Sequence, residues 1–121
     1  HKNAIKNYLT PLENLELLFN DAELKIAFEW LRKFSLFDLQ DELTASLSYG
    51  QQKKLALIRV LARSSDLIIL DEPLVGLDQA TADQLTSFLI QKLSEGVSLI
   101  LTSHINPMID CRVLDIGAND A

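Results

Sequence analysis

Two stretches of the sequence decide the fold. They are Leu47-Ser48-Tyr49-Gly50-Gln51 and the apolar run Leu67-Ile68-Ile69-Leu70, which ends in Asp71-Glu72. Ser48 and Gln51 have the spacing of a capping box, which predicts that a helix begins there. The apolar run predicts a short strand that is buried on both faces of a parallel sheet. A helix followed by an α/β unit is therefore expected.

The residues before Ser48 predict a helical region. Thr10-Pro11-Leu12-Glu13 and Asn20-Asp21-Ala22-Glu23 each place a capping side chain three residues before a glutamate, which indicates a helix start. Leucine and aromatic residues then recur at helical spacing as far as about Phe37. Residues 38–47 have no clean period and are predicted to be a connector.

The residues after the first strand predict a second helix and further strands. Residues 79–94 have a helical pattern, with Gly96 as the C-terminal stop. Residues 97–101 predict a second buried strand and residues 112–116 a third. Strand, helix and strand of these lengths form a right-handed βαβ unit. The fold class is thus α/β, with a helical part at 1–63 and a sheet-containing part at 64–121.

The first two predicted strands end in polar residues, namely Asp71-Glu72 and Thr102-Ser103-His104. Ligands bind outside the carboxyl ends of parallel strands, so these residues are expected to share one rim. One carboxylate there can hold Mg²⁺ through water, and the next can polarise an attacking water. A plain polar turn after a strand, with a structural histidine, is the simpler alternative. Ser48 has two interpretations as well, a phosphate site at a helix start or an ordinary cap.

All of these features together resemble the ABC ATPases. The stretch from Leu47 to Gln51 is similar to the family's signature, Leu-Ser-Gly-Gly-Gln, and Leu67 to Glu72 to its Walker B motif. Gly76-Leu77-Asp78 and Ser103-His104 follow in the positions of the D-loop and H-loop. The resemblance implies a partial P-loop NTPase fold. Residues 1–63 would be the signature-bearing helical subdomain with a remnant of the Q-loop, and residues 64–121 the C-terminal part of the RecA-like core.

The resemblance assigns roles toward the chain's own ATP and Mg²⁺. Asp71 would serve the Mg²⁺ shell through water, and Glu72 would be the general base. His104 would hold the γ-phosphate and the water, and His1 falls at the position of the Q-loop glutamine.

The resemblance also implies a second ATPase subunit, with two ATP molecules between the subunits. Ser48, Gly50 and Gln51 would bind the γ-phosphate of the partner's ATP, and Asp78 would communicate across the dimer. Tyr49 stands where the family signature usually has its first glycine, whereas Gly50 matches the second glycine.

The opening segment is similar to one branch of the family, the ATP-binding subunits of haem exporters in cytochrome c biogenesis. This resemblance rests on His1, the loop that contains Ile5-Lys6, and the helix start from Leu9 to Leu15. This branch implies ATP hydrolysis coupled to transport, and integral membrane transporter subunits as partners. It also implies a peripheral location on the cytoplasmic face of the inner (plasma) membrane, with the mitochondrial inner membrane as an alternative.

Composition excludes several functions. The net charge of -6 argues against a nucleic-acid surface, and no apolar run is long enough to span a bilayer.

The 121 residues contain no Gly-x-x-x-x-Gly-Lys-Ser/Thr phosphate loop, so the chain alone is expected not to hydrolyse ATP. Two alternatives stay open: the C-terminal lobe of a chromosome-maintenance ATPase, and a non-catalytic split half acting as a binding module.

Overall fold

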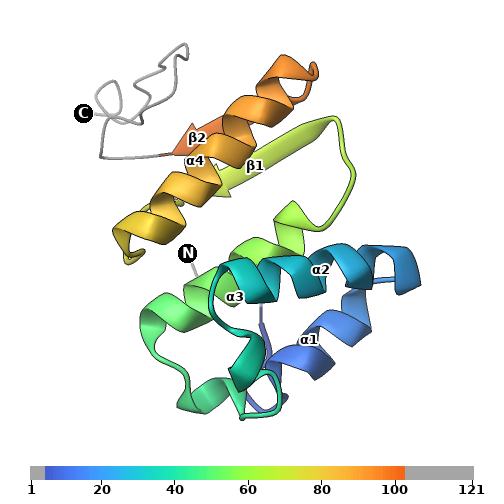
Figure 1. The fold of residues 1–121 in the computed structure, drawn as a ribbon, viewed down its shortest axis with the longest axis vertical. Coiled ribbons are helices and arrows are strands. Elements are labelled where there is room, and N and C mark those ends of the chain that lie inside the picture. The colour runs from blue at the N-terminus through green and yellow to red at the C-terminus, as the bar shows by residue number, and fades with distance from the viewer. Residues whose placement is uncertain (1–4, 103–121) are drawn as a thin grey trace, which may run out of the picture.

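The computed structural model describes residues 5–102. Three helices precede a βαβ unit in which α4 lies against a pair of strands (Figure 1). In chain order the helices and strands are α1 (Pro11–Leu18), α2 (Asp21–Lys33), α3 (Tyr49–Leu61), β1 (Leu67–Asp71), α4 (Gln79–Ser94) and β2 (Ser98–Thr102). The expected α/β order, with the helices first, is confirmed for these residues.

Reciprocal capping boxes start the first two helices. The Thr10 hydroxyl accepts the Glu13 N–H at 3.0 Å, and the Glu13 carboxylate accepts the Thr10 N–H at 2.9 Å. Asn20 and Glu23 repeat the arrangement at the start of α2. Each pair satisfies two polar groups that the helix itself leaves without partners.

The second helix ends earlier than the pattern predicts. It stops at Lys33, before Phe37, because Ser35 takes a left-handed backbone conformation with a φ of 60°. The connector then forms two short 3₁₀ turns, Phe37–Leu39 and Thr44–Ser46.

The two strands are parallel, and α4 connects them. Leu67 pairs with Ser98 and Asp71 with Thr102, so both carboxyl ends reach the same rim of the sheet, as expected. Gly96 has a φ of 94°, which glycine adopts without steric cost, and the chain turns there from α4 into β2.

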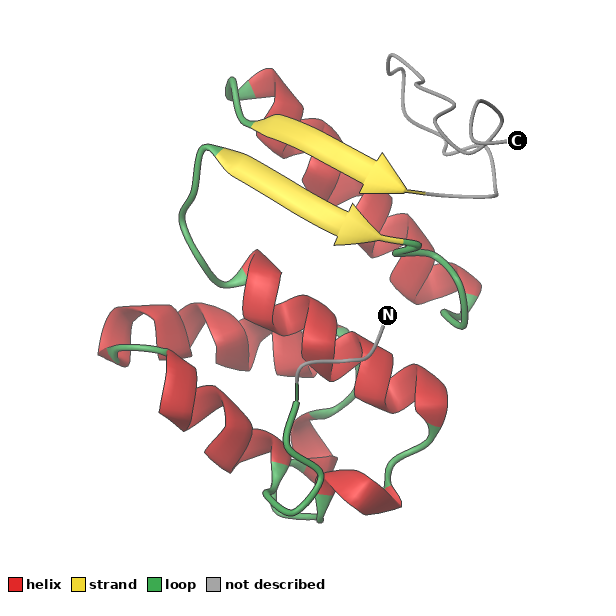
Figure 2. Ribbon diagram, turned by 180° about the vertical axis from the view of Figure 1, so that it is seen from behind, coloured by secondary structure: helices red, strands yellow, loops and turns green. Residues whose placement is uncertain are grey.

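The prediction that β1 is buried on both faces is wrong. Ile68 and Leu70 are buried, whereas Leu67 and Ile69 are 46% and 60% exposed. The prediction of a second buried strand at 97–101 is wrong as well, since no residue of β2 is buried and Ile100 is half exposed. Figure 2 shows the reason: α4 lies behind the strands, and no described helix covers the side toward the viewer. An aliphatic run reports apolar character on both faces, but burial requires a covering layer on each.

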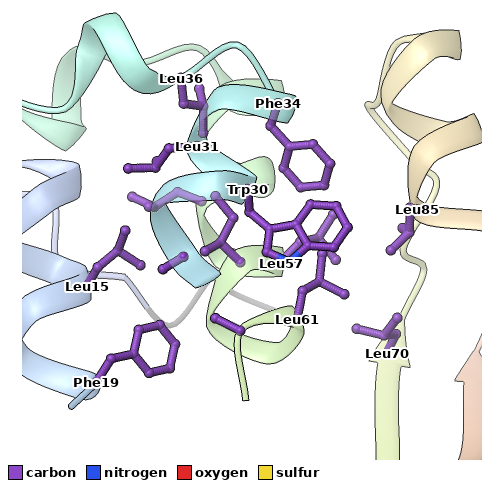
Figure 3. Packing of buried hydrophobic residues seen from close by; sticks show 14 of the residues in the cluster. Leu15, Phe19, Trp30, Leu31, Phe34, Leu36, Leu57, Leu61, Leu70 and Leu85 are labelled. Atoms are coloured by element: carbon purple, nitrogen blue, oxygen red, sulfur yellow. The ribbon is translucent and has the colours of Figure 1, made fainter. Parts of the chain in front are cut away.

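One hydrophobic cluster joins the helices to the βαβ unit. Trp30 of α2 lies edge-on to Phe88 of α4, with ring centroids 5.0 Å apart. Trp30 also contacts Phe34, and both point toward Leu70 and Leu85 (Figure 3). The helical part is therefore packed directly on the sheet-bearing part, which fixes α3 relative to the end of β1.

Several expectations fall outside the described residues. They concern His1, Ser103, His104 and the strand predicted at 112–116. Within residues 5–102, no helix has the length and apolar character needed to cross a membrane.

Candidate functional site

The carboxyl end of β1 presents an ionised carboxylate. The Thr102 hydroxyl donates a hydrogen bond to the Asp71 carboxylate, and this bond lowers the pKa of Asp71. The bond exists because Asp71 and Thr102 are register partners on adjacent parallel strands. A charged, solvent-exposed carboxylate suits a Mg²⁺ ion that keeps its water shell. No group of three His, Cys, Asp or Glu side chains forms a direct metal cage among the described residues.

Glu72 follows in an uncommon backbone conformation. Its φ is 47°, in the left-handed region, and its N–H donates to the Thr102 carbonyl at 2.8 Å. The Lys53 ammonium, on α3, donates a hydrogen bond to the Glu72 carbonyl. Burial lowers the pKa of Lys53, while the charges of Glu72 and Asp71 act in the opposite direction. The Glu72 backbone is thus held from two sides, by β2 and by α3.

The start of α3 has the predicted capping box. The Ser48 hydroxyl accepts the Gln51 N–H at 3.1 Å, and the Gln51 side-chain oxygen accepts the Ser48 N–H at 2.9 Å. The Ser48 hydroxyl keeps its own hydrogen available for donation. Tyr49 and Gly50 occupy the first two helical positions, whose N–H groups the helix leaves without intrahelical acceptors. This end of α3 is a suitable site for an anion.

The loop at 73–78 lies against the start of α3. Gly76 has a φ of 81°, and a Cβ there would be 2.9 Å from a carbon of the Tyr49 ring. A Cβ on Gly50 would be 2.8 Å from the Gly76 carbonyl oxygen. Gly50 is therefore required by a backbone contact, and Gly76 is favoured by its left-handed backbone conformation. The need for a glycine at position 50 has an explanation here that does not involve a phosphate.

Asp78 closes this loop and caps α4. One of its oxygens accepts the Thr81 N–H at 2.7 Å, and the other accepts from the Lys54 ammonium at 3.3 Å. Hydrogen bonding by Thr81 lowers the pKa of Asp78 to about 2. Lys54 also donates to the Phe34 carbonyl at 3.1 Å, so it connects α2, α3 and the loop. Both Asp78 oxygens are engaged within the chain.

The structure brings the two deciding stretches of sequence together. Ser48, Gly50 and Gln51 lie at the start of α3, and the loop at 73–78 and Lys53 connect them to Asp71 and Glu72. The sequence placed Thr102 at this rim, and the structure adds that its hydroxyl donates to Asp71. Reasoning from sequence missed Lys53 and Lys54. The two lysines gave no signal, because their partners are 19 to 24 residues away.

A family profile described as ABC transporter matches residues 1–75. The chain belongs to the ABC transporter family. Among relatives of this family, the cytochrome c biogenesis ATP-binding export protein CcmA of Idiomarina loihiensis is 39% identical over 106 residues, which cover 86% of this chain and 49% of that protein. The protein of the same name from Roseobacter denitrificans is 33% identical over 121 residues, 97% of this chain and 57% of its own. The chain spans about half the length of the curated relatives it matches.

Solved ABC structures have the same arrangement of elements. The ATP-binding subunit of an ABC transporter matches with a TM-score of 0.77 and 26% identity, over 85% of this chain and 45% of that one. A dimeric ATP-binding cassette in a post-hydrolysis state, bound to ADP and phosphate, matches with a TM-score of 0.69 and 26% identity, over 84% of this chain and 49% of that one. The fold is therefore the P-loop NTPase fold of ABC cassettes, represented here in part.

Proposed function

We propose that this chain forms the signature-bearing part of the ATP-hydrolysing subunit of an ABC transporter. The observation that carries the proposal is the arrangement of two sites around α3. The capped start of this helix, with Ser48, is suited to an anion, and its Lys53 holds the backbone of Glu72 beside the ionised Asp71. Residues 1–63 would act as the helical subdomain and residues 64–121 as part of the core.

The residues divide into two groups by the nucleotide they serve. Asp71 would hold Mg²⁺ through water, and Glu72 would accept a proton from the attacking water. His104 and His1 would act at the same ATP. Mg²⁺ held there would supply positive charge against the negative charge that develops on the phosphates.

Ser48, Gly50 and Gln51 would contact the γ-phosphate of an ATP held by a second ATPase subunit. The dimeric cassette among the solved relatives supports such a partner. Asp78 would take part in the contact between subunits through the α4 start that it caps, since its own oxygens are engaged with Thr81 and Lys54.

Cargo and location are inferred from the relatives. Their names contain cytochrome c biogenesis and export, which supports haem as the transported species and membrane transporter subunits as partners. The protein would then be peripheral to the cytoplasmic face of the inner membrane. The same names favour a transporter over a chromosome-maintenance ATPase.

The test is steady-state hydrolysis of Mg-ATP by the native-length protein purified with its membrane subunits. Glu72→Gln should lower kcat by a factor on the order of 100 or more, because general-base catalysis typically contributes that much. Glu16→Gln, at an exposed glutamate of α1, is the matched control and should leave kcat unchanged. Hydrolysis that survives Glu72→Gln would contradict the assignment. If the protein co-purifies solely with membrane subunits unrelated to haem or cytochrome assembly, the proposal that haem is the transported species is wrong.

A further inference from the structure

Tyr49 is the one residue of the Leu47–Gln51 stretch that departs from the family's glycine, and its ring has a definite contact. Although the side chain is 64% exposed, a Cβ placed on Gly76 would meet two of its ring carbons, at 2.9 and 3.2 Å. The ring therefore lies directly against the backbone of Gly76. It covers the turn between the end of β1 and the start of α4.

Tyr49, Gly50 and Gly76 are packed closely against one another. Gly76 can lie under the ring because it has no side chain, and its φ of 81° is a conformation that L side chains rarely adopt. The Gly76 carbonyl oxygen in turn lies 2.8 Å from the point where a Cβ on Gly50 would be, which is too close for a side chain at position 50. Tyr49 and Gly50 thus fit the turn from two sides of its backbone.

The turn that Tyr49 covers is anchored at its two ends, through Glu72 and Asp78, and is open in its middle. Its internal hydrogen bonds, from the Val75 N–H to the Glu72 carbonyl and from the Leu77 N–H to the Leu74 carbonyl, are both 3.3 Å long. Val75 and Gly76 are exposed to solvent. The turn begins at Glu72 and ends at Asp78, so its position determines where both carboxylates lie relative to Ser48.

We propose that Tyr49 is a positioning residue for ATP hydrolysis. Its ring holds the turn at 72–78 against the start of α3 and so fixes the Glu72 carboxylate in its working position. A glycine at position 49, the usual residue in the family, would leave this side of the turn uncovered. The proposal rests on the hydrolytic function proposed above.

The kinetic test uses the native-length protein with its membrane subunits. Tyr49→Gly should lower kcat roughly tenfold with little change in the KM for ATP, since a small displacement of a catalytic group has effects of this size. Tyr49→Phe keeps the ring and should match the wild type. Unchanged kcat in Tyr49→Gly would overturn the proposal, and so would an equal loss in Tyr49→Phe, which would assign the effect to the hydroxyl.

A double-mutant cycle tests the contact itself. Gly76→Ala should lower kcat in the wild-type background, where the new methyl group meets the Tyr49 ring. It should lower kcat less in the Tyr49→Gly background, where only the strain of the left-handed backbone remains. Equal effects of Gly76→Ala in both backgrounds would show that the ring and the turn are uncoupled, and would overturn the proposal.

Hydrogen exchange separates this inference from the function on which it rests. Peptides covering residues 72–78 should exchange faster in Tyr49→Gly than in the wild type or in Tyr49→Phe, whether or not ATP is hydrolysed. Unchanged exchange overturns the positioning role of Tyr49 and leaves the proposed function intact. A wild-type protein without Glu72-dependent hydrolysis overturns both.

Discussion

The ammonium group of Lys53, on α3, donates a hydrogen bond to the backbone carbonyl of Glu72 at the end of β1. Lys53 is 7% exposed, and burial lowers the pKa of its ammonium. Glu72 has a left-handed backbone, which a residue with a side chain keeps when its surroundings hold it there. The hydrogen bond supplies part of that hold, and it joins the helix that begins at Ser48 to the proposed general base.

Replacing Lys53 by methionine should therefore lower both ATP hydrolysis and stability. Lys53→Met keeps the apolar stem of the side chain but removes the donor, so kcat should fall roughly tenfold as Glu72 shifts. The free energy of unfolding should fall by about 1 to 3 kcal/mol, the cost of leaving a polar group without its partner. Lys25→Met, at an exposed lysine of α2, is the control for loss of charge. Equal ATPase rates in the two variants would refute the prediction.

Ser48 should have a role beyond capping, and Thr10 offers a matched comparison. Both residues cap helices through reciprocal boxes, so each alanine variant should lose about 1 kcal/mol of unfolding free energy. Ser48→Ala alone should also lower ATP hydrolysis, at least about tenfold, because it would remove the proposed donor to the phosphate. Chemical denaturation and ATPase rates, measured on both variants, make the comparison. If Ser48→Ala loses no more ATPase activity than Thr10→Ala, then Ser48 acts only as a helix cap.

Asp78 should make stability depend on pH in the acid range. Hydrogen bonding by Thr81 lowers its pKa to about 2, whereas the unfolded carboxylate titrates near about 3.9. Its contribution is therefore fully present above about pH 4 and is lost as the pH falls toward 2. Asn also caps helices but does not titrate, so Asp78→Asn should flatten this part of the profile. Thermal unfolding midpoints of both proteins, recorded between pH 2 and 6, should converge at the acid end. Parallel curves would rule out a contribution from Asp78.

The 121-residue chain on its own should not hydrolyse ATP. Its sequence has Asp71, Glu72 and His104 but no Gly-x-x-x-x-Gly-Lys-Ser/Thr loop to cradle the phosphates. The purified chain, incubated with Mg-ATP, should show the rate of a buffer blank, and its Glu72→Gln variant should be identical. A steady rate that disappears in that variant would disprove the prediction and would assign phosphate binding to other residues.

Local features of this chain were predictable from the sequence. The capping boxes at Thr10, Asn20 and Ser48 involve partners three residues apart, and the structure confirms all three. The helix predicted at 79–94 has the observed bounds, because Asp78 caps its start and Gly96 ends it. Parallel topology then follows from strand and helix lengths, and it brings Asp71 beside Thr102.

Contacts between distant segments were not predictable in the same way. Nothing local marks Tyr49 as the neighbour of Gly76, or Lys53 as the donor to Glu72, because each pair depends on how α3 packs against the sheet. Burial of β1 was overestimated for a related reason. Aliphatic side chains on both faces indicate what a strand can bury, whereas the amount it does bury depends on the layers present.

The half-covered sheet has a consequence for handling the chain. Leu67, Ile69 and Ile100 expose apolar surface on one face, and within residues 5–102 each strand has only one neighbour. An apolar strand with a free edge is a template for pairing with another chain. The strands should therefore drive concentration-dependent self-association of the 121-residue chain. Light scattering would register it, and Ile69→Lys, on the open face, should suppress it.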